Sequence, residues 1–384
     1  MSAIDESVLD DAEARTAVDQ SEMLRAVATA GAQIRIASTA SAESGLAVRV
    51  AADGRPRAVV LAGMGGSGIA GEAVAALCGA SSPAPVLAGH GYTLPAWVGA
   101  VDLVIAVSCS GTTEETLAVV EEAVRRGTRL LTIGPPDSLL AALSEQARAI
   151  HVPISSGGRL PRANMWALTV PALIAVHALG LVVVPAGILE RTADRLDAIA
   201  EQCRPSSESF MNPAKSLALE LAGYLPMVWG SGPVAAVAAY RFGCQLNENS
   251  KLPAVIGTLP EANHNQVVAL DGRFGRLASP SGDPNADLFR DRVDEPEAGR
   301  LRLVLMRDRV EHPQVARRAA ASVELATDRG VPVNELVAEG EHPLEQLASL
   351  VGVGDFASVY LALLHGTDPT PIAAIAELKE RIVR

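Results

Sequence analysis

Aromatic residues and cysteines are scarce in this sequence. Phe, Trp and Tyr make up 3% of the 384 residues, so the core must consist mostly of Ala, Val and Leu. The four cysteines, at positions 78, 109, 203 and 244, form no C-x-x-C pair, so the sequence shows neither a zinc knuckle nor a redox motif. Scattered single cysteines are typical of a reducing compartment, and no metal-ligand pattern is present.

Basic residues are outnumbered by acidic ones. The chain has 32 Lys and Arg against 44 Asp and Glu, a formal net charge of -12, which argues against DNA or RNA as a partner. A small phosphorylated ligand remains compatible with this charge, because backbone N–H groups and hydroxyls can bind it. The first 20 residues are acidic and lack the apolar segment of a signal peptide, so we expect a cytoplasmic protein.

One uncharged run, residues 168–189, is long enough to span a bilayer. Pro171, Pro185 and His177 interrupt it, and the sequence has no second run of this kind. Flanking clusters of Lys or Arg, which anchor membrane helices, are also missing. We therefore expect a buried helix followed by a strand or loop, and no association with a membrane.

Short apolar segments alternate with helical patterns in both halves of the chain. This alternation predicts an α/β fold with two parallel sheets, each flanked by helices on both faces. Each half opens with a strand and a Gly-Ser-Gly turn, which indicates an internal duplication. The expected strands are 58–62, 102–107, 130–134, 150–154, 226–230, 267–270, 301–308 and 332–338.

We expect an N-terminal extension with a helix over 1–44 and two domains over 45–203 and 204–384. Residues 204–209 mark a break between the halves. Residues 270–300, rich in Gly, Pro, Asp and Arg, are predicted to be a loop insertion.

Two motifs follow the first two strands. Residues 63–68 match G-x-G-x-x-G, but no acidic residue follows about 20 positions later, so a dinucleotide site is disfavoured. Ser108, Ser110 and Thr113 place three hydroxyls where a buried strand passes into a helix, a setting that favours an anion such as phosphate. An ordinary helix cap is the alternative, although capping would explain only one hydroxyl.

The segments GMGGSGIAG and SCSGTTEET together resemble the sugar-isomerase (SIS) fold, and more narrowly the bifunctional phosphoglucose/phosphomannose isomerases. The resemblance implies that Ser108, Ser110 and Thr113 bind a phosphate and that Gly66 and Ser67 line the sugar. Cys109 and Thr112 depart from the Tyr and Asn usual in that family. Neither change removes one of the matched hydroxyls.

Two further segments, NENSKLP and EANHN, resemble the family's acid–base residues. The resemblance implies that Glu248 moves a proton between C2 and C1 and that His264 opens the sugar ring. Without it, Glu248 could equally be a solvated helix end and His264 a loop histidine.

Matches at LPRA and in the C-terminal DPTPIAAIAELKERI extend the resemblance to nearly the whole chain from about residue 45. They imply that Arg162 stabilises an enediolate, that Lys379 reaches into the site and that Thr370 lies near sugar hydroxyls. A cation at a helix start is mildly unfavourable, which makes a functional reason for Arg162 more plausible.

The sequence therefore predicts a metal- and cofactor-independent isomerase of glucose 6-phosphate, mannose 6-phosphate or both, and the resemblance implies a homodimer. A non-catalytic sugar-phosphate sensor is one alternative. A SIS enzyme for an amino-sugar or heptose phosphate is another. The preference between the glucose and mannose epimers is open.

Overall fold

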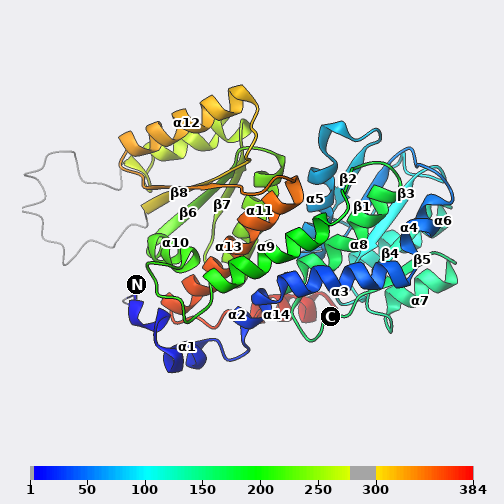
Figure 1. Cartoon of the computed structure of the whole chain (residues 1–384), viewed down its shortest axis with the longest axis horizontal. Helices are drawn as coiled ribbons and strands as arrows, with labels where there is room; N and C mark the ends of the chain where they lie inside the picture. Colours follow the sequence, from blue (N-terminus) through cyan, green and yellow to red (C-terminus); the bar gives the residue numbers. More distant parts are fainter. Residues whose placement is uncertain (1–3, 277–299, 384) are drawn as a thin grey trace, which may run out of the picture. The chain divides into compact units, whose positions relative to one another are not determined.

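The computed structural model describes residues 4–276 and 300–383, so most of the expected loop insertion at 270–300 lies outside the described residues. The chain forms two compact units (Figure 1). The five-stranded unit comprises Ala26–Ala198 and Glu341–Ala348. The four-stranded unit comprises Met1–Arg25, Ile199–Gly340 and Ser349–Arg384. Residues 1–25 therefore group with the second half of the chain. The predicted limits of 1–44, 45–203 and 204–384 instead place them in a separate N-terminal extension.

The five-stranded unit alternates strands and helices along the chain. Its elements are α3 (Ala30–Glu43), α4 (Leu46–Ala51), β1 (Val59–Ala62), α5 (Gly66–Cys78), η2 (Gly79–Ser81), β2 (Val86–Gly89), β3 (Leu103–Val107), α6 (Glu114–Arg125), β4 (Arg129–Gly134), α7 (Leu139–Gln146), β5 (Ile150–Pro153), η3 (Pro161–Ala163) and α8 (Met165–Ala178). Helices α2 (Met23–Ala28) and α9 (Ile188–Gln202) cross the limits of the two units.

The sheet of this unit is parallel throughout, with strand order β2-β1-β3-β4-β5. Every residue of β1 and β3 is buried, as expected of a parallel sheet covered on both faces. From β1 the chain continues to β2 on one side of the sheet, and from β3 it continues to β4 on the other side. The loops after β1 and β3 therefore lie side by side at the carboxyl ends of the strands. Ligands of open α/β sheets bind at such a point.

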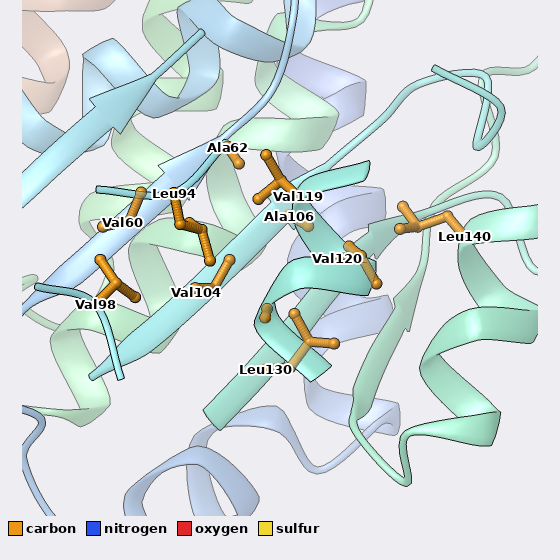
Figure 2. Packing of buried hydrophobic residues seen from close by; sticks show 11 residues of the cluster. Val60, Ala62, Leu94, Val98, Val104, Ala106, Val119, Val120, Leu130 and Leu140 are labelled. Carbon is orange, nitrogen blue, oxygen red and sulfur yellow. The ribbon is translucent and has the colours of Figure 1, made fainter. Parts of the chain in front are cut away.

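The core on one face of this sheet consists of small aliphatic side chains. Val60 and Val104 point from neighbouring strands toward Val119 and Val120 of α6, and Leu140 of α7 extends the cluster (Figure 2). Removing a side chain of this size from water contributes about 1.5–3 kcal/mol to folding. The core therefore rests on many such contacts, as the low aromatic content predicts.

The four-stranded unit repeats the same plan with strand order β7-β6-β8-β9, again parallel. The predictions of an α/β fold and of a duplicated strand order are confirmed. Its elements are η1 (Glu6–Leu9), α1 (Ala12–Val18), α10 (Pro213–Leu221), β6 (Tyr224–Gly230), α11 (Pro233–Glu248), β7 (Val255–Thr258), η4 (Glu261–His264), η5 (Gln266–Asp271), β8 (Arg300–Arg307), α12 (Pro313–Asp328), β9 (Val333–Val337), α13 (Pro343–Leu364, which begins in the five-stranded unit) and α14 (Ala373–Val383).

Helix α12 covers one face of the second sheet, where Ala319 and Ala326 pack with Trp229 and Leu303. Helices α10 and α13 lie on the other side of these strands (Figure 1). In the described part of the chain, α13 is the one helix long and apolar enough to cross a membrane. Because 89% of its apolar window is buried inside the protein, it has the character of a core helix.

The uncharged run at 168–189 contains most of a buried helix, α8, which ends at Ala178 and is followed by a loop. This agrees with the expectation of a buried helix. The predicted strand at 267–270 is wrong: these residues form the short helix η5, because a four-residue apolar run does not distinguish a strand from a helical turn. The sequence prediction also missed two strands, β2 and β7. Both have four residues, lie at sheet edges and are only partly buried, so neither shows a continuous buried apolar run.

Candidate active site

The glycine-rich loop after β1 is packed too closely for larger residues. Gly65 has φ +54°, a conformation that favours glycine. A Cβ on Gly66 would lie 2.5 Å from the carbonyl oxygen of Pro161. The buried Ser67 accepts a hydrogen bond through its Oγ from the N–H of Cys109 at 3.1 Å. The glycine loop is therefore fixed both to η3 and to the loop that follows β3.

Three hydroxyls converge in the loop after β3, which we call the hydroxyl loop (residues 108–113). The Oγ of Ser108 lies 2.9 Å from Thr113 Oγ1, and Ser110 Oγ lies 3.4 Å from each of them. The N–H of Gly111 also donates to Ser108 Oγ at 2.9 Å. Because α6 begins immediately afterwards, the positive end of its dipole adjoins the hydroxyls. The arrangement suits an anion that accepts hydrogen bonds.

Helix capping does not account for this cluster. Thr113 is the N-cap residue of α6, yet its side chain forms no capping hydrogen bond. Its hydroxyl lies against Ser108 instead. The exposed N–H groups at the start of α6 therefore lack a side-chain cap, as at helix ends that bind anions.

Arg162 lies in η3, beside the glycine loop. Its side chain is buried, and its backbone nitrogen lies 3.0 Å from where a Cβ on Gly66 would be. The next buried polar residue, Asn164, donates through Nδ2 to the carbonyl oxygen of Leu160 at 3.0 Å. The five-stranded unit thus brings one group of predicted residues together: Gly66, Ser67, Ser108, Ser110, Thr113 and Arg162.

Two titratable side chains adjoin these loops. Burial raises the pKa of Cys109 to about 11, so the thiol stays neutral at physiological pH. His90 faces two acceptors: its Nδ1 lies 3.0 Å from the carbonyl oxygen of Gly63 and its Nε2 lies 2.7 Å from Glu72. Burial opposes the imidazolium form, but these hydrogen bonds outweigh it and raise the pKa of His90.

The predicted base, Glu248, is the last residue of α11 in the four-stranded unit. Lys251, which follows in a left-handed conformation at φ +54°, donates to the carbonyl oxygen of Glu248 at 2.8 Å. The same ammonium group donates to the carbonyl oxygens of Asp368 and Pro369, each at 3.1 Å. Lys251 therefore holds the end of α11 beside the chain that leads to Thr370.

Helix α11 is also anchored to α13 by a buried ion pair. Arg241 donates to Asp355 at 2.9 and 2.6 Å, and Gln245 donates to the same carboxylate at 3.1 Å. One turn further on, Asn249 donates to Ser358 Oγ at 2.9 Å. These polar contacts fix the position of the helix end that carries the predicted base.

The predicted ring-opening residue, His264, lies at the other end of the second sheet. Helix α11 leaves the carboxyl end of β6 and returns along the sheet for about 24 Å, so Glu248 lies toward the amino ends of the strands. Strand β7 then runs parallel to β6, and the exposed His264 ends η4 just beyond it. Within one copy of the chain, the structure does not bring Glu248 and His264 together.

Thr370 and Lys379 lie close to the C-terminus. The N–H of Thr370 donates to Asp368 Oδ1 at 2.9 Å, in the segment held by Lys251. Lys379 is exposed on α14, and its ammonium group forms no ion pair within the described residues. Thr370 therefore shares its surroundings with Glu248, whereas no hydrogen bond or ion pair of the described residues links Lys379 to either acid–base residue.

The Gly-Ser-Gly turn of the second half adjoins a carboxylate of the protein itself, unlike the glycine loop of the first half. Ser231, after β6, accepts through Oγ from the N–H of Asp308 at 3.2 Å, just as Ser67 accepts from Cys109 in the first half. The Asp308 carboxylate accepts from the N–H of Ala235 at 2.7 Å, at the start of α11. An internal carboxylate thus occupies the start of α11, the helix that corresponds to α5. Helix α12, which corresponds to α6, is capped by His312, whose side chain accepts from the N–H of Gln314 at 3.2 Å.

Some contacts at these sites escaped the sequence reasoning. Lys251 lies inside the segment NENSKLP, and Asn164 directly follows LPRA, so a sequence motif contained or adjoined each of them. Asp308 gave no signal, because its partner Ala235 is 73 positions away. In residues 4–276 and 300–383, no three His, Cys, Asp or Glu side chains gather as ligands for a metal ion.

Comparisons with known proteins agree with this architecture. Residues 210–382 match the family described as the bacterial phospho-glucose isomerase C-terminal SIS domain. A bifunctional phosphoglucose/phosphomannose isomerase of Caldicellulosiruptor bescii is 31% identical over 84% of this chain and 89% of its own length. That of Aquifex aeolicus is 32% identical over 85% and 90%.

A solved structure also shares the fold. A hypothetical protein from Thermus thermophilus superposes with a TM-score of 0.69 at 15% identity, covering 98% of this chain and 94% of that one. Both alignments with the sequence relatives extend over most of each relative's length. The chain therefore belongs to the family of bifunctional phosphoglucose/phosphomannose isomerases.

Proposed function

We propose that this protein is an aldose–ketose isomerase that interconverts glucose 6-phosphate, mannose 6-phosphate or both with fructose 6-phosphate. The observation that carries the proposal is the convergence of Ser108, Ser110 and Thr113 at the uncapped start of α6. The names of the related enzymes support the same substrate class. The phosphate binds at the hydroxyl loop, and Gly66 and Ser67 line the sugar.

The chemistry is proton transfer without a metal ion. His264 protonates the ring oxygen and opens the sugar, and Glu248 removes the proton from C2 and returns it to C1. The planar cis-enediolate formed between these steps carries negative charge, which Arg162 stabilises. Lys379 and Thr370 are the further residues assigned to this site. Because the intermediate is planar at C2, one site accepts both epimers.

We further propose that the working enzyme is a homodimer in which Glu248 and His264 of one site come from different copies. The support is their placement beyond opposite ends of β7 within one copy. A two-fold symmetric dimer would supply each site with one residue from each chain.

A complementation experiment tests both proposals. We expect the Glu248→Gln and His264→Asn variants to be inactive separately in a coupled assay with glucose 6-phosphate and mannose 6-phosphate, with chelator present. Co-refolded in equal amounts, half of the dimers are mixed and each mixed dimer has one intact site, so about a quarter of the wild-type activity returns.

Three other results are informative. Full turnover by Glu248→Gln would remove the base assignment. Inactive variants that stay inactive when mixed would remove the shared site. A wild-type protein that binds fructose 6-phosphate without converting it would instead be a sugar-phosphate sensor, the alternative that the sequence left open.

A further inference from the structure

Arg159, in the loop between β5 and η3, is held by an unusual clamp. Its Nε donates to Asn164 Oδ1 at 3.0 Å, and Asn164 Nδ2 donates back to the carbonyl oxygen of Arg159 at 3.1 Å. Asn164 itself is 1% exposed, so the clamp is rigid. Among the described residues only Nε has an acceptor, so the two terminal nitrogens of the guanidinium group are left for another one.

The clamp lies against the hydroxyl loop. Pro161, which lies between the two residues of the clamp, packs closely against Gly66 of the glycine loop. Burial raises the pKa of the Cys109 thiol, and the positive charge of Arg159 opposes that rise. Cys109 stands between Ser108 and Ser110, and its N–H is bound by Ser67. The clamp therefore lies close to the loop whose hydroxyls converge.

Arg159 is half-buried, yet no carboxylate pairs with it in the described part of the chain. Several other arginines of this acidic protein are paired with carboxylates: Arg35 contacts three of them and Arg57 contacts Asp102. Loss of solvent lowers the pKa of Arg159, which means that the charged form is partly desolvated without compensation. A bound anion would supply the missing partner.

We propose that Arg159 is a further phosphate-binding residue, whose clamped guanidinium group supplies the positive charge that the neutral hydroxyl loop lacks. Two parallel terminal N–H groups match two phosphate oxygens, a geometry that a lysine cannot reproduce. The need for a cation is greater here because α6 begins with Glu114 and Glu115. This assignment rests on the proposed function, since it concerns the phosphate of the same substrate.

The test compares three variants with the wild type by calorimetry, using inorganic phosphate and fructose 6-phosphate as ligands. For Arg159→Gln we expect binding of both ligands to weaken about 10- to 100-fold, the usual effect of losing a charge-assisted contact. For Arg159→Lys we expect an intermediate loss. Arg125→Gln is the matched control: it removes the same charge at the far end of α6, about 17 Å from the hydroxyl loop, and should change binding less than twofold.

Turnover gives a second readout. Because the phosphate contact is present in both the substrate complex and the transition state, Arg159→Gln should raise KM by the same factor and change kcat less than about threefold. The weakening should also diminish at high salt, which a merely structural defect would not show. Melting curves confirm that each variant is folded, and if the Gln variant is not, the Lys variant tests the same contact.

Unchanged phosphate binding in the Arg159 variants would overturn the assignment, as would an equal loss in Arg125→Gln. Either result leaves the isomerase proposal intact if the wild type still converts the sugar phosphates. Conversely, a wild type that binds phosphate through Arg159 without turnover would overturn the proposed function and keep this one.

Discussion

Replacing Gly66 by alanine tests how the glycine loop and η3 fit together. The new Cβ would lie 2.5 Å from the carbonyl oxygen of Pro161 and 2.7 Å from its carbonyl carbon. Both neighbours are backbone atoms, so no side-chain rotation relieves the conflict. Normal contact distances require a separation about 0.7–1 Å larger, and the movement falls on η3, which carries Arg162.

The displacement should affect activity more than stability. Overpacking of this kind costs about 1–3 kcal/mol, but alanine in place of glycine at a helix start offsets up to about 1 kcal/mol of that. A catalytic group misplaced by about 1 Å can cost about 100-fold in rate. We therefore expect kcat/KM to fall about 10- to 100-fold while the free energy of unfolding decreases by no more than about 2 kcal/mol.

The measurements are a coupled assay with glucose 6-phosphate and urea denaturation of the same preparation. Gly91→Ala is the control, because a Cβ on Gly91 would meet no heavy atom within 4 Å and its φ is not positive. We expect the control to match the wild type in both measurements. A Gly66→Ala enzyme with at least half of the wild-type kcat/KM would refute the reasoning that close packing of this loop on η3 places the catalytic arginine.

Two further predictions concern the described ion pairs. Asp355→Ala leaves the buried Arg241 without its carboxylate, so we expect a loss of about 3–5 kcal/mol in urea denaturation, and a loss below 1 kcal/mol would contradict a buried pair. Burial lowers the pKa of His90, but the hydrogen bonds to Glu72 and to the carbonyl of Gly63 outweigh it, so the folded-state pKa is raised. The His90–Glu72 pair therefore contributes stability that is present below the unfolded-state pKa of about 6.5 and is lost as the pH rises through the folded-state value. The difference in Tm between wild type and Glu72→Gln should therefore shrink from pH 6 to pH 9, and a constant difference would argue against the pair.

The sequence predicted the central strands because their signal is local. β1 and β3 are runs of buried Val, Leu, Ile and Ala, each followed by a loop motif. β2 and β7 were not predicted, because their residues are partly exposed and stand between proline-containing segments. A short edge strand is defined mainly by the neighbour with which it pairs, and that information is not local.

The same distinction applies to the candidate site. The three hydroxyls lie within six consecutive residues, so one motif was enough to predict that they converge. The clamp between Arg159 and Asn164 depends on how the loop before η3 folds and on how η3 packs against Gly66, about 95 positions earlier. The opposite placement of Glu248 and His264 depends on strand direction, which sequence spacing alone did not reveal.

The two halves show why duplicating a fold does not duplicate a site. Both have a serine after the first strand that accepts a backbone N–H from the loop after the next central strand. In the first half that N–H belongs to Cys109, in the loop that leads to the uncapped start of α6. In the second half it belongs to Asp308, whose carboxylate accepts from the N–H of Ala235 and so occupies the start of α11, which corresponds to α5. Helix α12, which corresponds to α6, is capped by the side chain of His312. Burial raises the pKa of Asp308, which indicates that this internal anion is costly to keep charged and is retained by its backbone donors. Because Asp308 occupies the start of α11 and His312 caps α12, the second half is left to supply side chains such as Glu248 rather than a second phosphate site.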